Sequence, residues 1–104
     1  MIKVSAMYPT APGARFYHDY YRDQHMPMLQ DRLGEACRHY TSDRGLVGGI
    51  PGSSARYVAM CHIFSESIEA FQKGFVPHAA EILADITNYT DVSPTMQISE
   101  VVVG

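Results

Sequence analysis

Hydrophobic and polar residues alternate along several segments of the chain, and this period of two predicts β-strands. Residues 2–8 alternate with one better-buried face, and residues 57–64 carry apolar side chains on both faces. The second pattern is typical of a strand that is covered on both sides. We expect two further strands, at 36–46 and at 95–103.

Apolar and aromatic residues spaced three or four positions apart predict a first helix after the turn at 9–13. Within this helix, Pro27 would remove a hydrogen bond and clash with the preceding turn. We therefore predict two pieces, 14–25 and 27–33, with Pro27 opening the second piece and Gly34 closing it.

A second helical segment follows a potential N-terminal cap at 65–67. Gly74 is expected to interrupt this helix. Pro77 is expected to open a new helical piece that runs over 77–86, because proline is favoured in the first turn of a helix.

The predicted order of elements is strand, helix, strand, strand, helix, strand, which indicates an α+β chain with the ferredoxin-like βαββαβ arrangement. Two helices would cover one face of a four-stranded antiparallel sheet, and residues 1–104 would form a single domain. A ligand would lie in the cleft between the sheet and the helices, beside the aromatic side chains of the first helix.

The other face of the sheet would be uncovered and partly apolar, since alternation places Val58, Met60, Val101 and Val103 on it. A sheet-to-sheet homodimer is the simplest way to remove such a face from water. A second copy of the chain is therefore the expected protein partner.

Composition and charge exclude further classes of partner. The net charge is −3 and the eight lysines and arginines are scattered, so the basic stripe of a nucleic-acid-binding protein is missing. No apolar run approaches the ~20 residues that cross a bilayer, which argues against a membrane protein. The first residues do not resemble a signal peptide, and Cys37 and Cys61 lack the spacing of a redox motif. We expect a cytoplasmic protein with reduced thiols.

Tyr21 and His25 are the first candidates for chemistry, because they lie one helical turn apart beside the predicted kink. Histidine titrates near neutral pH, so His25 could act as an acid or a base, or orient a ligand. The alternative is structural: Tyr21 packs, and His25 bonds a free backbone carbonyl at the kink. His18 lies seven residues before His25, too far for both to hold one metal ion, and no metal site is predicted.

His78 is the second candidate, since it follows Pro77 in the first turn of a predicted helix. The positive end of the helix dipole favours a neutral imidazole there, which can accept a proton or polarise a carbonyl. The alternative is an exposed residue without a role. Motifs that specify a reaction or a cofactor, such as HExxH, GxSxG or a phosphate-binding loop, are missing from the chain.

The residues of several segments resemble the EthD-like family. The segment YYRDQHMPM is similar to the family's Tyr-x-x-x-His-x-Pro signature, which places Tyr21, His25 and Pro27 at the signature positions, with His78 in a second motif. The resemblance extends over nearly the whole chain, through 43–45, 57–62, 67–71, 77–79 and 85–90. It implies the dimeric α+β barrel fold, in agreement with the predicted order of strands and helices.

The resemblance implies a function in outline. The family takes its name from a protein needed for bacterial degradation of ethyl tert-butyl ether, and the wider superfamily includes cofactor-free quinol monooxygenases, polyketide cyclases and muconolactone isomerase. One hypothesis is a cofactor-independent oxygenase, cyclase or isomerase of a catabolic or secondary-metabolite pathway, with a hydrophobic small molecule as substrate. Tyr21, His25 and His78 would be its catalytic residues. The alternative is a non-catalytic accessory protein that binds such a molecule for an oxygenase pathway, and no cofactor is expected in either case.

Overall fold

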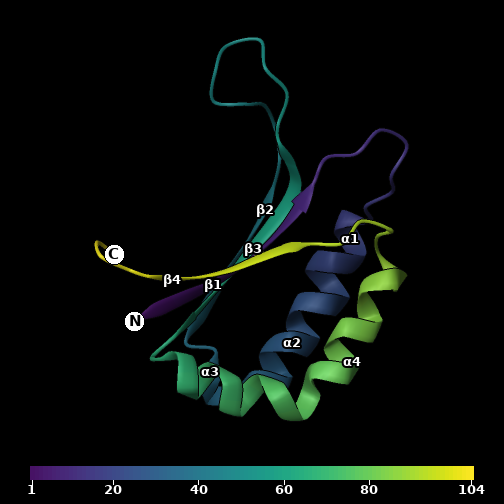
Figure 1. The fold of residues 1–104 in the computed structure, drawn as a ribbon. Helices are drawn as coiled ribbons and strands as arrows, with labels where there is room; N and C mark the ends of the chain where they lie inside the picture. Colours follow the sequence, from purple (N-terminus) through teal and green to yellow (C-terminus); the bar gives the residue numbers. More distant parts are fainter.

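A four-stranded antiparallel sheet forms one layer of the structure, a computed structural model that describes residues 1–104. Its strands lie in the order β2-β3-β1-β4, so the first and third strands are central. The predicted α+β ferredoxin-like arrangement is confirmed, although β2 and β4 are shorter than expected. The strands are β1 Ile2–Pro9, β2 His39–Arg44, β3 Tyr57–Ser65 and β4 Thr95–Glu100 (Figure 1).

Two helical runs form the second layer, and both lie on the same face of the sheet (Figure 1). Each run consists of short helices that differ in pitch and follow one another directly. No helix has the length and apolar composition needed to cross a membrane. The first run is α1 His18–Tyr20, the π-helix η1 Tyr21–His25, α2 Met26–Leu33 and the 3-10 turn η2 Gly34–Ala36; the second is α3 Ile68–Phe75, η3 Val76–His78, α4 Ala79–Ala84 and η4 Asp85–Asn88.

The first helical run begins at His18, four residues later than predicted. The residues before it are taken up by pairing with a distant segment. Phe16 forms a bridge with Thr90, and the N–H of Tyr17 donates to the carbonyl of Tyr89 at 2.8 Å. Sequence periodicity does not reveal this pairing, so the predicted start of the helix is too early.

The predicted division of the first helix at Pro27 is confirmed, but it is a change of helix type and the chain does not leave the helical state. The chain stays helical because η1 is wider than an α-helix, and the N–H of Met26 reaches the carbonyl of Tyr21, five residues earlier. Pro27 then lies in the first turn of α2, where a missing N–H costs least. Gly34 ends the helix with a φ of 57°, as predicted for a C-terminal glycine.

Gly74 does not interrupt the second run, in contrast to the prediction. It lies inside α3, and a Cβ atom there would come within 2.5 Å of the Cβ of Ala36, so the glycine lets α3 pack closely against η2. Pro77 lies within the same run, in η3, and the predicted new helix is a change of pitch before α4. The predicted cap is confirmed at Ser67, whose hydroxyl accepts a hydrogen bond from the N–H of Ala70.

The hydrophobic core fills the space between the sheet and the helices. It contains one face of the central strands and the inner side of both helical runs, and Cys61 is part of it, as expected for a small apolar side chain. The space predicted for a ligand is therefore occupied largely by side chains. The core consists of 14 buried residues: Val4, Ala6, Tyr8, Tyr21, Met26, Leu29, Leu33, Cys37, Ala59, Cys61, Ile63, Phe71, Ile82 and Tyr89.

The opposite face of the sheet carries no helix (Figure 1). Its side chains are less apolar than predicted. Alternation along β3 places Met60 on this face, as expected. The centre of the face is polar, because Ser5 pairs with His62 and the two side chains are hydrogen-bonded at 2.7 Å. Val101 and Val103 were expected here, but both follow the end of β4.

Candidate functional site

His25 lies at the end of η1 with only 3% of its surface exposed. Its Nδ1 is 2.9 Å from Oδ2 of Asp85, a carboxylate sixty residues later in the chain. The imidazole is nearly parallel to the ring of Tyr21, with an angle of 11° and 5.6 Å between the ring centres. The ring of Tyr89 is tilted against it at 4.7 Å. The imidazole is thus held by contacts to both helical runs.

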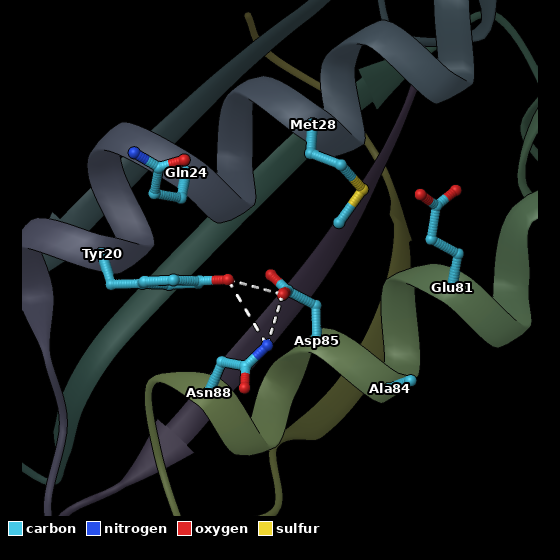
Figure 2. Close-up of a pocket in the computed structure, with 7 residues that line it drawn as sticks. All are labelled: Tyr20, Gln24, Met28, Glu81, Ala84, Asp85 and Asn88. Atoms are coloured by element: carbon cyan, nitrogen blue, oxygen red, sulfur yellow. Dashed lines mark hydrogen bonds between the residues drawn. The ribbon is translucent and has the colours of Figure 1, made fainter.

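Asp85 follows the end of α4 and is hydrogen-bonded to three side chains. The hydroxyl of Tyr20 and Nδ2 of Asn88 donate to its Oδ1 at 2.7 and 2.9 Å (Figure 2). Burial would raise the pKa of Asp85, but the hydrogen bonds from Tyr20, Asn88 and His25 outweigh burial and hold this pKa below its usual range. Asp85 is therefore a carboxylate at neutral pH.

The ionised Asp85 determines which nitrogen of His25 carries the hydrogen. A carboxylate has no hydrogen to donate, so Nδ1 of the imidazole must be the donor. Burial lowers the pKa of His25, and the hydrogen bond and charge of Asp85 offset only part of this effect. The ring is therefore neutral at neutral pH. Its lone pair lies on Nε2, which has no hydrogen bond to the protein.

Tyr21 has a buried hydroxyl without a hydrogen-bond partner. The residue is 2% exposed. Burial raises the pKa of Tyr21 well above its usual range, and the neighbouring Cys61 and Tyr8 add to the effect. The phenol is therefore neutral, and the thiol of Cys61 and the hydroxyl of Tyr8 lie near it without the geometry of a hydrogen bond, which is uncommon for a buried hydroxyl.

Tyr21 belongs to an aromatic cluster formed by Tyr8, Phe16, Tyr21 and Tyr89. Most of its rings meet edge to face, as Tyr8 and Tyr21 do at an angle of 79° with 5.7 Å between their centres. The hydroxyls of Tyr8 and Tyr89 are 2.5 Å apart, so each is the other's partner. Burial raises the pKa of Tyr8 to about 12, so this phenol stays protonated at neutral pH. The aromatic cluster therefore gives His25 an apolar environment that contains only neutral hydroxyls.

Two of the cavities are lined by a partner of His25, and neither of them is lined by His25 itself. The helix cavity, of about 380 Å³, lies between the first helical run and α4, and Tyr20 and Asp85 are among its lining residues (Figure 2). The sheet cleft, of about 180 Å³, lies between the first helical run and β2 and is lined in part by Tyr21. The two cavities therefore reach the two partners of His25, Asp85 in one case and Tyr21 in the other.

The structure brings two of the three predicted site residues together. Tyr21 and His25 stack on each other, whereas the half-buried His78 forms no hydrogen bond with either. His78 lies in η3 at the start of α4, seven residues before Asp85. This corresponds to about 10 Å along a helix axis. No group of three or more His, Cys, Asp or Glu side chains could hold a metal ion.

Sequence reasoning did not assign a role to Asp85 or to Tyr89. The partner of His25 is sixty residues away, and no spacing rule connects the two. One signal was nevertheless present. A carboxylate at the C-terminal end of a helix faces the negative end of the helix dipole, so Asp85 is unfavourable there without a partner.

Comparison with known proteins shows the family of this chain. Residues 13–93 match the EthD domain. The chain belongs to the EthD family. An EthD-like protein from Ralstonia eutropha JMP134 is similar to it, with 54% sequence identity and a TM-score of 0.94 over 98% of this chain and 92% of that one. No protein of curated function matches the chain.

Two more distant structures share the fold of this EthD-family protein. An ethyl tert-butyl ether D (EthD) family protein from Bacillus halodurans C-125 has 20% identity and a TM-score of 0.72, over 96% of this chain and 97% of that one. HapK from Hahella chejuensis has 12% identity and a TM-score of 0.59, over 100% of this chain and 96% of that one. At these identities the likeness concerns the fold alone.

Proposed function

We propose that this EthD-family protein binds a hydrophobic small molecule beside the aromatic cluster and uses His25 as a general base. The reaction would be a cofactor-independent one of the oxygenase, cyclase or isomerase type, in a catabolic or secondary-metabolite pathway. The observation that carries the proposal is the 2.9 Å contact between Nδ1 of His25 and the ionised Asp85.

A base of this kind has two requirements, and His25 fulfils both. It must be unprotonated at the working pH, and burial lowers the pKa of His25. It must also be held in one tautomer, and Asp85 does this by accepting the hydrogen of Nδ1. When Nε2 takes a proton from the ligand, the negative charge of Asp85 stabilises the imidazolium that forms. Tyr21 would donate its unpaired hydroxyl to an oxygen of the ligand.

The enclosure of His25 favours a second candidate, a binding protein without catalysis. The imidazole is 3% exposed and stacks against Tyr21, so a ligand can reach Nε2 only when neighbouring side chains move. A ligand could bind next to Tyr21 without ever contacting His25. In this case the protein would hold a hydrophobic molecule for another enzyme of the pathway, and the pair of His25 with Asp85 would only stabilise the helical layer.

A ligand screen followed by variants separates the two candidates. Phenols, quinols and aromatic ketones are tested by thermal shift, because selective binding stabilises the folded state. Each stabilising compound is then incubated with the protein, and its consumption is followed by mass spectrometry. Stabilisation without consumption supports the binding protein and contradicts the enzyme.

With a consumed compound, His25→Gln should lower turnover by about 100-fold or more, the usual contribution of a general base. His39→Ala is the matched control, because His39 is exposed on β2 and away from the cluster. Full turnover by His25→Gln would refute the role of His25 as general base. A loss of turnover in His78→Ala would show that His78 takes part, as the sequence predicts, despite its distance from His25.

We also propose that the protein forms a homodimer through the open face of the sheet. The support is the uncovered face itself and the loop at 45–56, whose residues Leu46, Val47 and Ile50 are 84, 74 and 76% exposed. Met60→Lys, on the open face, should shift the mass measured by light scattering from dimer to monomer. Met96→Lys is the control, because alternation places Met96 on the other face. A monomeric wild-type protein would refute the dimer.

A further inference from the structure

The sheet cleft offers a binding site for one kind of chemical group. It lies where the edge strand β2 passes the start of the first helical run, and its volume of about 180 Å³ is small. Typical pockets for drug-sized ligands measure roughly 300–1,000 Å³, so the sheet cleft suits only a small molecule or one end of a larger one. Its lining residues are His18, Asp19, Tyr21, Arg22, Ser42, Asp43 and Arg44.

Most charges around the sheet cleft are already paired. Arg22 contacts Asp23 at 2.7 Å and Asp19 at 3.6 Å. Asp43 lies 3.4 Å from Nε2 of His62, which belongs to the open face of the sheet, so its carboxylate is turned away from the cleft. Both acidic residues of the cleft therefore have partners, Asp19 in Arg22 of the cleft itself and Asp43 in His62 on the open face.

Arg44 is the exception. Its guanidinium has no carboxylate within ion-pair distance and no hydrogen bond to another side chain. Burial lowers the pKa of His18, and the positive charge of Arg44, which lines the same cleft, lowers it further. With His18 neutral, Arg44 is the one unpaired charge that the cleft presents.

Tyr21 lines the same cleft and carries a second unpaired group. Its hydroxyl is buried and has no acceptor in the protein. A buried hydroxyl without a partner is costly in a folded chain, since it loses its bonds to water and gains none. A donor of this kind and a free guanidinium together fit a ligand that brings both negative charge and acceptor oxygens.

We propose that the sheet cleft binds the carboxylate of a small aromatic or short-chain organic acid, with Arg44 pairing its charge and Tyr21 donating to one of its oxygens. The inference deepens the proposed function, because Tyr21 stacks on His25 and the bound acid would lie next to the proposed base. It names the class of ligand as an organic acid and not a neutral hydrophobic molecule.

Benzoate is the probe that tests this site, and benzamide is its neutral counterpart of the same shape. Isothermal titration should show that the wild-type protein binds benzoate at least about tenfold more tightly than benzamide, as expected for one charge-assisted hydrogen bond. Arg44→Gln should remove this preference. Arg38→Gln, which changes an exposed arginine paired with Glu66, is the matched control and should leave it unchanged.

Tyr21→Phe should weaken the binding of benzoate by about tenfold, while its circular dichroism spectrum stays the same as that of the wild type. His25→Gln should still bind benzoate with the preference that depends on Arg44, because neither binding group is altered. This variant separates the two proposals: loss of turnover with retained benzoate binding supports both, and retained turnover refutes the base but not the acid site. Equal binding of benzoate and benzamide, an unchanged preference in Arg44→Gln, or no saturable benzoate binding would overturn the inference.

Discussion

Replacing Tyr21 by phenylalanine removes a hydroxyl that bonds nothing in the folded protein. The usual effect of a buried Tyr→Phe change is a loss of stability, because a hydrogen bond disappears. At this position there is no such bond to lose. We therefore expect the variant to be more stable than the wild type, with a higher free energy of unfolding.

The magnitude follows from the burial of the group. Keeping a buried polar group without a partner costs about 1–3 kcal/mol, and the variant recovers this free energy. The small cavity left by the missing oxygen cancels part of the gain. A net gain of about 1 kcal/mol is expected, which corresponds to roughly 4 °C in the melting temperature of a domain of this size. Tyr89→Phe is the matched comparison. It breaks the bond between Tyr89 and Tyr8 and leaves the hydroxyl of Tyr8 unpaired, so it should lose about 1–2 kcal/mol.

Urea unfolding followed by circular dichroism measures both variants against the wild type. All samples must have the same protein concentration, since association would change the apparent stability. A loss of stability in Tyr21→Phe as large as that in Tyr89→Phe would refute the reasoning. It would mean that the hydroxyl of Tyr21 has a partner in solution, with the neighbouring thiol of Cys61 as the first candidate.

Three further variants test other parts of the structure. Asp85→Asn should move the hydrogen of His25 to Nε2. Tyr20 and Asn88 would donate to the new amide oxygen, so the amide NH₂ would face Nδ1 and donate to it. ¹⁵N spectra of the imidazole report the tautomer, and an unchanged signal of Nε2 would contradict this. Lowering the pH from about 7 to 5 should reduce the free energy of unfolding, since the pKa of His25 is below 6.5 in the folded protein and the unfolded chain takes up the proton first. His25→Gln should make this pH dependence shallower. An equal slope in the variant would argue against a lowered pKa of His25. Gly74→Ala should destabilise the protein by about 1–3 kcal/mol through its clash with η2, although alanine normally favours a helix, and a stabilised variant in thermal unfolding would be inconsistent with the close packing.

The strands were predictable because their signal is local. The alternation at 2–8 and 57–64 gave β1 and β3 almost to the residue, since each has one face buried against the helices. β4 was predicted too long because the run of valines after it is apolar without being part of the sheet. Hydrophobicity alone does not distinguish a paired strand from an exposed tail.

The helices were predictable in place but not in shape. Pro27 marked where the second piece opens, but the sequence did not predict that the chain stays helical there through the π-helix η1. The rule for Gly74 failed for a related reason, because the close approach of η2 makes a glycine favourable inside α3. Both errors come from contacts or hydrogen-bond patterns that depend on the folded chain.

The candidate site was half predictable. Tyr21 and His25 could be identified because they share one helix face and one motif. Asp85 joins them only after the two helical runs pack together, so its role follows from the fold. The unpaired state of Arg44 is likewise a property of the folded structure, since the neighbouring Asp43 pairs with His62 on β3.

The wide turn at η1 accommodates one residue more than an ordinary α-helical turn. Deleting one residue between Tyr21 and His25 would let an ordinary α-helix form. The residues on either side would keep nearly the same direction, because five residues of a π-helix turn about as far as four of an α-helix. Tyr20 would then still face Asp85, and Tyr21 would still face the sheet. The family can therefore change the length of this segment by one residue without dismantling the site.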